Sequence, residues 1–202
     1  MSASPENRGV FEPFEIGRRF RIVQAGEQED DDKLDIVMQR GAFGSGEHET
    51  TVSCLEMIEQ LDLQGKRVLD LGSGTGILGI AASLCGARDI LCVDIDPDAV
   101  ANARENCRLN KIDEGTVRHL AGTLDDVQEN RFDIVLANIY GDILIDLCND
   151  LVEKVNPDGT LLLSGILWEY NFDVRNLYEQ ASCEVTKNRL MDEFSTILLT
   201  KS

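Results

Sequence analysis

The sequence lacks the long apolar runs that a membrane span requires. No stretch of its 202 residues approaches the roughly 18 uncharged apolar residues of a transmembrane helix. Residues 1–8 contain no apolar core, so we expect no secretory signal. Six cysteines are present but no C-x-x-C pair, which argues against a disulfide framework or a metal site. We therefore expect buried free thiols and a reducing, cytoplasmic location.

Basic residues are also scarce. Lysine and arginine number 19 against 37 aspartates and glutamates, and the net charge is −18. Such a surface repels phosphate backbones, so a large nucleic-acid interface is disfavoured. It could attract a basic protein, or it could serve solubility alone. We interpret the acidic run over residues 27–32 as a solvated loop rather than a metal site.

Hydrophobic residues, in contrast, make up 43% of the chain, which is typical of a globular protein. From residue 67 onward, apolar runs of strand length alternate with helical patterns, which predicts a parallel sheet with right-handed crossovers. The expected strands are 67–71, 89–94, 116–121, 132–137 and 160–164. The expected helices are 76–86, 97–110, 140–154 and about 169–181.

The two ends of the chain depart from this rhythm. Strands are expected at 183–190 and 194–200, and the three residues between them are too few for a helical crossover, so the last strand must run antiparallel. The fold class is therefore α/β, a doubly wound, mostly parallel seven-stranded sheet with an antiparallel last strand. Before it, we expect a strand or hairpin in 10–25, an apolar run at 34–38 and a helix over 50–61. We assign 1–40 to an N-terminal arm with the acidic loop and 41–202 to the main domain.

The stretch V-L-D-L-G-S-G-T-G-I-L-G-I, residues 68–80, places Gly72, Gly74 and Gly76 directly after the first parallel strand. Glycines there let the backbone approach a ligand at the carboxyl end of the sheet. A dinucleotide normally uses the spacing G-x-G-x-x-G. Here the spacing differs, and Asp70 would repel a pyrophosphate. A cofactor with a cationic end, a ribose and an adenine fits better, and S-adenosylmethionine has these parts.

Three later segments extend this cofactor site. Asp94 ends the second strand, where a carboxylate can accept both ribose hydroxyls. A nicotinamide enzyme uses an acid in the same place, and Asp94 could instead only cap the next turn. We include the neighbouring Ile95 in the site. Thr123 and Leu124 follow the third strand, where backbone groups could meet the adenine edge, although a plain turn is an alternative.

Asn138 emerges from the fourth apolar strand at the same edge of the sheet. An amide there can accept a hydrogen bond from a substrate amine and donate another. The alternative is that Asn138 caps the helix that begins at Tyr140. We predict that Asn138 orients the acceptor and that Tyr140 forms part of the substrate wall.

These motifs together resemble the class I methyltransferase fold and, more closely, the PrmA-type family of ribosomal protein methyltransferases. The segment A-F-G-S-G-E-H-E-T-T, residues 42–51, is similar to that family's A-F-G-T-G-x-H-x-T-T signature. Four further segments are similar to the same family: residues 11–20 before the main domain, the glycine loop, V-D-I-D-P at 93–97 and A-N-I at 137–139. The resemblance implies cofactor contacts at Thr51, Gly72, Asp94 and Asn138, with residues 43–51 folding over the cofactor. His48 would order this loop or handle a proton.

The chain also departs from the family pattern. Members normally carry a separate N-terminal domain that captures the ribosomal substrate, whereas here the sequence begins close to the catalytic part. Glu49 stands where the family usually has proline. The resemblance implies methyl transfer from S-adenosylmethionine to a protein amino group, leaving S-adenosylhomocysteine. Alternatives are a lysine methyltransferase of the electron-transfer-flavoprotein type, a small-molecule or RNA methyltransferase, and a non-enzymatic cofactor-binding module.

Overall fold

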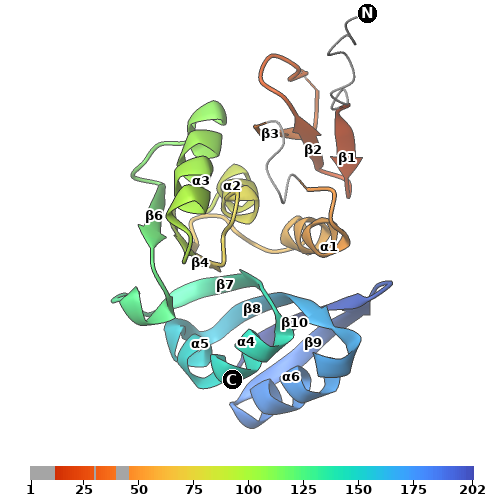
Figure 1. Cartoon of the computed structure of the whole chain (residues 1–202), viewed down its shortest axis with the longest axis vertical. Helices are drawn as coiled ribbons and strands as arrows, with labels where there is room; N and C mark the ends of the chain where they lie inside the picture. Colours follow the sequence, from red (N-terminus) through yellow and green to blue (C-terminus); the bar gives the residue numbers. More distant parts are fainter. Residues whose placement is uncertain (1–11, 30, 40–45) are drawn as a thin grey trace, which may run out of the picture.

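The computed structural model describes residues 12–29, 31–39 and 46–202. These residues form two β-sheets, one of seven strands and one of three. Figure 1 shows the larger sheet between two helical layers, with α1, α2 and α3 on one face and α4, α5 and α6 on the other. The doubly wound α/β class predicted from the sequence is therefore confirmed.

The large sheet has seven strands in the order β6-β5-β4-β7-β8-β10-β9. All neighbouring pairs up to β8 are parallel, and β10 runs antiparallel to both β8 and β9. The bounds of the strands are β4 Arg67–Leu71, β5 Asp89–Asp94, β6 Val117–Ala121, β7 Phe132–Asn138, β8 Val155–Leu167, β9 Cys183–Leu190 and β10 Phe194–Lys201. The strand order reverses at β4, where parallel α/β sheets bind their ligands.

The helices lie close to their predicted ranges, with one difference. Their bounds are α1 Glu49–Ile58, α2 Ile77–Leu84, α3 Pro97–Leu109, α4 Gly141–Asp146, α5 Cys148–Lys154 and α6 Trp168–Gln180, with a 3₁₀ turn, η1, at Leu124–Asp126. The single helix expected over 140–154 is wrong, because the chain leaves the helical conformation at Leu147 (φ −90°, ψ 4°). Asp96 caps α3 as its sequence suggests, accepting from the N–H of Asp98 at 2.9 Å with Pro97 at the first position.

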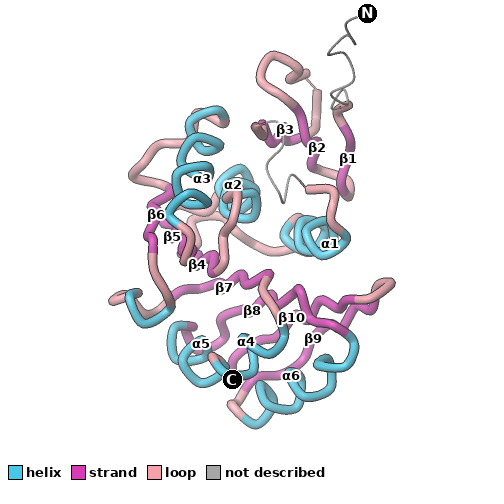
Figure 2. Tube along the Cα trace, in the orientation of Figure 1, coloured by secondary structure: helices cyan, strands magenta, loops and turns pink. Residues whose placement is uncertain are grey.

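The small sheet comprises β1 Phe14–Ile16, β2 Phe20–Val23 and β3 Leu34–Val37. The tube view shows it above α1 and α2 (Figure 2). Buried residues of this sheet share one apolar core with α1 and α2, so it is packed onto the main domain. The predicted boundary at 40–41 falls in residues 40–45, outside the described residues, as do residues 1–11 of the predicted arm.

The acidic loop between β2 and β3 is more ordered than a freely solvated segment. Arg21 of β2 donates to Glu29, Asp31 and Asp35 at 2.7–2.9 Å. Two carboxylates of the run thus neutralise a cation whose side chain is buried. Asp30 lies outside the described residues. The prediction of a loop is confirmed, but its charges also tie β2 to the loop and to β3.

A second ionic network joins the amino ends of three neighbouring strands. Arg67 of β4 and Arg118 of β6 both donate to Asp89 of β5 at 2.7 Å, and both reach Glu129 before β7. The network lies at the opposite end of these strands from the glycine loop, so it aligns the strands without occupying the ligand edge. All six cysteines are free, and five of them are buried, as the sequence predicts.

None of the helices in the described parts of the chain is long and apolar enough to cross a bilayer.

Candidate active site

The glycine loop connects β4 to α2 at the carboxyl edge of the sheet. The N–H groups of Gly72 and Ser73 both donate to the Val93 carbonyl, at 2.8 and 3.0 Å, which holds the loop against β5. Gly72 and Gly74 have φ values of 70° and 53°, which favour glycine. A Cβ on Gly72 would overlap the side chain of Ile139, whereas a Cβ on Gly74 would meet nothing within 4 Å. The loop is therefore packed at its start and open at its middle.

Buried polar groups support the loop from behind. The side-chain amide of Asn106, a fully buried residue of α3, donates to the Thr75 carbonyl at 2.9 Å and accepts from the N–H of Gln39 at 3.1 Å. Ser73 is buried, and its hydroxyl has no hydrogen-bond partner in the described part of the chain. Because a buried polar atom without a partner is uncommon, this hydroxyl marks a place where a ligand or water would bind.

Asp94 lies at the end of β5, directly beside this loop. Its carboxylate accepts from the N–H of Gly74 at 2.7 Å and from that of Asp96 at 3.0 Å. A carboxylate offers about four acceptor positions, so these two bonds leave capacity for ligand hydroxyls. The structure thus brings Asp94 and the open part of the glycine loop together, as the sequence predicts.

Asp70 lies one layer below the loop. It is fully buried, and its carboxylate accepts from the N–H of Gly79 in α2 at 2.9 Å and from the Cys92 thiol at 3.9 Å. Burial, and to a lesser extent the charge of Asp94, raises the pKa of Asp70 to about 7. These contacts connect β4 to the first turn of α2 and to β5. A direct contact with a cofactor stays a prediction.

The remaining predicted cofactor residues differ in their setting. Ile95 is 76% exposed beside Asp94, so it offers apolar surface at the sheet edge. The N–H of Thr123 already donates to Asp126 at 2.8 Å in a capping box, and the Leu124 side chain is buried in the core. Only backbone groups of this turn remain for a ligand. The turn lies beside the site because the N–H of Gly122, the residue before it, donates to the Asp94 carbonyl at 2.9 Å.

Thr51 and Asn138 meet at the same edge although 87 positions separate them. The Asn138 amide donates to the Thr51 hydroxyl at 3.5 Å, which joins the start of α1 to the end of β7. Thr51 is buried and Asn138 half-buried. Tyr140 follows as the residue before α4, and its side chain is 69% exposed. The arrangement leaves the amide oxygen of Asn138 without a hydrogen-bond partner in the described residues.

His48 is the N-cap of α1. Its Nδ1 accepts from the N–H of Thr50 at 3.4 Å and lies 2.8 Å from the Thr50 hydroxyl, while its ring meets Phe194 edge to face at 5.3 Å. These contacts support the loop-ordering role, and the proton-handling role stays a prediction. Residues 42–45 of the motif lie outside the described residues. The folding of residues 43–51 over the cofactor therefore stays a prediction.

Sequence reasoning missed how Glu49 and the β9–β10 turn complete this side of the site. The Glu49 carboxylate accepts from the N–H groups of Asp192 and Glu193 at 3.2 and 3.4 Å. Glu49 therefore has a structural use at the position where the family pattern has proline. No local signal pairs these distant segments, because only the folded sheet brings β10 beside α1.

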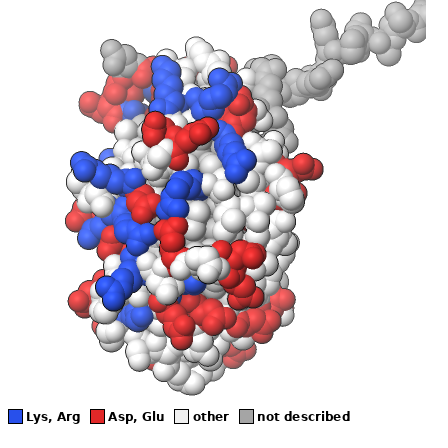
Figure 3. All heavy atoms as spheres, turned by 90° about the vertical axis from the view of Figure 1, so that its left-hand side faces the viewer, with Lys and Arg blue, Asp and Glu red and all other residues white. Residues whose placement is uncertain are grey.

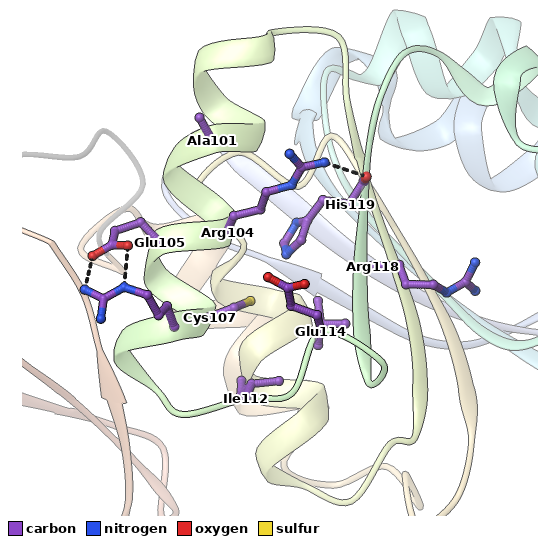
Figure 4. Close-up of a pocket in the computed structure, with 10 residues that line it drawn as sticks. Ala101, Arg104, Glu105, Cys107, Ile112, Glu114, Arg118 and His119 are labelled. Atoms are coloured by element: carbon purple, nitrogen blue, oxygen red, sulfur yellow. Dashed lines mark hydrogen bonds and ion pairs between the residues drawn. The ribbon is translucent and has the colours of Figure 1, made fainter.

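A cavity of about 550 Å³ lies elsewhere, between α3 and the edge strand β6 (Figure 4). Arg104, Cys107 and His119 are among its lining residues. Burial, together with the charge of Arg104, lowers the pKa of His119 to about 4, so this imidazole is neutral near pH 7. None of its lining residues belongs to the glycine loop or is Asp94, Thr51 or Asn138, so we place the candidate active site at the carboxyl edge of the sheet.

The strand order, the glycine loop after β4 and the carboxylate at the end of β5 define the class I, Rossmann-like methyltransferase fold. Within it, the sequence profile of the family described as ribosomal protein L11 methyltransferase (PrmA) matches residues 4–202. The chain belongs to this family.

Individual relatives agree with this assignment. The ribosomal protein L11 methyltransferase of Methylococcus capsulatus is 41% identical over 177 residues, which covers 87% of this chain and 59% of the relative. That of Geobacter metallireducens is 39% identical and covers 95% of this chain and 63% of the relative. The chain thus spans about three-fifths of the length of the curated relatives it matches.

Solved structures show the same fold. The ribosomal protein L11 methylase of Lactobacillus delbrueckii subsp. bulgaricus superimposes with a TM-score of 0.84 at 28% identity, covering 95% of this chain and 99% of that one. The magnesium protoporphyrin IX methyltransferase of Synechocystis PCC 6803, solved with bound S-adenosylhomocysteine, gives a TM-score of 0.61 at 14% identity, covering 76% and 85% of the two chains. The second comparison supports the fold alone.

Proposed function

We propose that this chain transfers a methyl group from S-adenosylmethionine to an amino group of a protein, either a lysine side chain or an N-terminal amine. The observation that carries the proposal is the convergence of the open glycine loop, Asp94 and the Thr51–Asn138 pair at one sheet edge. Family membership supports it, and the relatives' names make ribosomal protein L11 the first acceptor to test.

The residues at this edge fit S-adenosylmethionine, which supplies an electrophilic methyl group on a sulfonium when bound. Open space at Gly74 and the orphaned hydroxyl of Ser73 provide room and a polar partner. Asp94 retains acceptor capacity for the ribose hydroxyls, and exposed Ile95 offers apolar surface to the adenine. In its ionised form, the buried carboxyl of Asp70 favours a cation over a pyrophosphate near the loop. Gly72, Thr123 and Leu124 complete the proposed binding set through their backbone. Gly76 shapes the loop, since its N–H donates to the Ser73 carbonyl at 2.8 Å and its carbonyl accepts from the Ile80 N–H at 2.9 Å.

Asn138 has the chemistry to orient the acceptor amine. Thr51 receives one N–H of its amide, so the amide oxygen can accept an N–H of the incoming amine and direct the nitrogen lone pair toward the loop. A free lysine titrates near ~10.4, and desolvation lowers this value toward the neutral, nucleophilic form. Exposed Tyr140 forms one wall of the approach, and His48 holds the start of α1 in place.

The remaining features agree with a protein acceptor in a reducing compartment. The net charge of −18 favours a positively charged protein partner. Free cysteines throughout the chain fit the cytoplasm. We assign catalysis to residues 41–202, with the small sheet packed against them.

The proposal is tested by incubating the protein with radiolabelled S-adenosylmethionine and a cell lysate, then dividing the products by protease, nuclease and size. We expect label in a protease-sensitive band, absent with Asp94→Ala. Label confined to the nuclease-sensitive or small-molecule fraction would refute the protein acceptor. For Asn138→Ala we expect lost turnover and weakened cofactor binding, and full turnover with unchanged cofactor affinity would remove its proposed role.

A further inference from the structure

Exposed aromatic side chains gather on one side of the candidate active site. Tyr140 precedes α4, and Trp168 and Phe172 lie one turn apart at the start of α6, with 69%, 54% and 66% of their surfaces exposed. We call these three residues the aromatic rim. Of the six large hydrophobic residues that the described chain exposes, five lie on or beside α4, α6 and the end of β9: Tyr140, Ile143, Trp168, Phe172 and Leu190. Such clustering of apolar surface is typical of a binding region.

Packing contacts make the rim continuous. A Cβ on Gly141, the first residue of α4, would lie 2.8 Å from the side chain of Tyr170 in α6, so the two helix starts are in close contact. The Trp168 indole N–H donates to the Phe194 carbonyl at 3.1 Å. Figure 1 shows α4 and α6 side by side on the same face of the sheet. The three aromatic side chains therefore stand on one supported surface.

The rim begins at the proposed amine site. Tyr140 lies two residues after Asn138, and the Phe194 ring meets the His48 ring that caps α1. From Asn138 the surface runs outward to Trp168 and Phe172. A segment whose amine reaches Asn138 would thus cross the rim.

Carboxylates outnumber basic side chains in this region. Residues 46–65, 132–153, 155–174 and 190–200 near the rim contain no lysine or arginine, whereas α6 also contains Arg175 and β9 contains Arg189. Arg175 donates to Asn171 at 3.0 Å, and Arg189 forms an ion pair with Glu56. Exposed carboxylates adjoin the aromatic side chains, namely those of Asp142, Glu169, Asp173, Asp192 and Glu193. In contrast, Lys and Arg side chains gather over the α3 and β6 side in Figure 3. Arg104, Arg108 and Arg118 belong to those two elements.

We propose that the aromatic rim docks a lysine- or arginine-rich extended segment of the protein that carries the acceptor amine. This proposal rests on the proposed function and places its substrate on a defined surface. Aromatic faces attract ammonium and guanidinium groups, and neighbouring carboxylates strengthen that attraction. Tryptophan and tyrosine are also the side chains that most often dominate binding energy at interfaces.

Trp168 makes the proposal directly measurable, because it is the chain's single tryptophan. Its intrinsic fluorescence reports on the rim and on no other surface. We would titrate the protein with a short synthetic peptide of alternating lysine and alanine, and with its glutamate–alanine counterpart. We expect a saturable change in Trp168 emission with the lysine peptide alone, weakened by salt. An unchanged spectrum, or an equal response to both peptides, would overturn the proposal.

Matched variants separate the rim from the general acidity of the protein. The double variant Glu169→Gln, Asp173→Asn should bind the lysine peptide roughly 3–10-fold more weakly, which is the scale of two exposed ion pairs. Glu114→Gln with Glu153→Gln removes the same charge away from the rim and should change the affinity less than about twofold. Equal weakening by both double variants would contradict the proposal.

A kinetic readout distinguishes this proposal from the function on which it rests. With ribosomal protein L11 as acceptor, Phe172→Ala should raise KM roughly tenfold, the effect of losing an interface anchor, and leave kcat and cofactor affinity unchanged. Methylation with an unchanged KM would reject the rim and keep the function. Absence of methylation of this acceptor and of the proteins of a whole lysate by the unaltered protein would reject the function. An emission change that depends on protein concentration without peptide would show that a second copy covers the rim, and would also reject it.

Discussion

The buried carboxyl of Asp70 makes folding stability depend on pH in a way that one substitution can isolate. Burial raises its pKa from an ordinary 3.8 to about 7 in the folded chain. Folding thus favours the protonated form. The stabilisation is fully present when the pH lies below the pKa of Asp70 in the unfolded chain. It is lost as the pH rises through the pKa of Asp70 in the folded chain.

The size of the effect follows from these two values. At ~1.36 kcal/mol per pKa unit, the loss approaches about 4 kcal/mol at alkaline pH, and roughly 2–3 kcal/mol of it falls between pH 5 and pH 8. Asp70→Asn removes the titration and keeps an oxygen that can accept from the Gly79 N–H. Any fixed penalty for the new amide is the same at both pH values, so it cancels in the comparison.

The assay is urea denaturation of the protein without cofactor at pH 5, 6, 7 and 8. We expect the free energy of unfolding of the Asp70→Asn variant, relative to that of the unaltered protein, to rise by roughly 2–3 kcal/mol from pH 5 to pH 8. Asp150→Asn, a substitution of an exposed carboxylate in α5, serves as the control and should show no such trend. A constant difference between the Asp70→Asn variant and the unaltered protein would refute the reasoning about this buried group.

Three further predictions concern the site's other residues. Asp94→Asn should weaken S-adenosylmethionine binding by about 1.5–3 kcal/mol in calorimetry, the scale of a charged hydrogen bond, and an unchanged Kd would reject the ribose role. His48→Ala should lower the free energy of unfolding by roughly 0.5–2 kcal/mol in urea because α1 loses its N-cap, whereas a pH-dependent fall in kcat without a stability change would favour proton handling. Gly72→Ala should destabilise the protein because the new Cβ overlaps Ile139 at positive φ, and an unchanged thermal midpoint would contradict the packing of the loop.

Much of the fold was predictable because local signals and global topology agree in this chain. Continuous apolar runs mark β5 and β7, apolar residues on either side of Asp70 mark β4, and Asp96–Pro97 marks the start of α3. The gap of three residues before β10 alone requires an antiparallel strand. The break at Leu147 was not predictable, because the apolar spacing continues across it. The 13-residue length of β8 was missed because residues 155–159 contain turn-forming Asn156, Pro157 and Gly159.

The candidate site was predictable where its residues follow strands in sequence, and not where tertiary packing assembles it. Asp94 and Asn138 end apolar strands, so their shared edge follows from parallel topology. The contact between Asn138 and Thr51 spans 87 positions and depends on where α1 packs. Trp168 and Phe172 begin a helix whose apolar spacing gives no sign that they stay exposed. The Leu124 side chain belongs to the core, which the sequence of a short turn does not reveal.

The most direct test of the central claim is the intact mass of ribosomal protein L11 after incubation with this chain and S-adenosylmethionine, followed by mapping of the modified residue. The account predicts mass increments of one methyl group each, located on a lysine or N-terminal amine and absent with Asn138→Ala. An unchanged mass for this acceptor and for the proteins of a whole lysate, under conditions where the chain binds the cofactor, would contradict it.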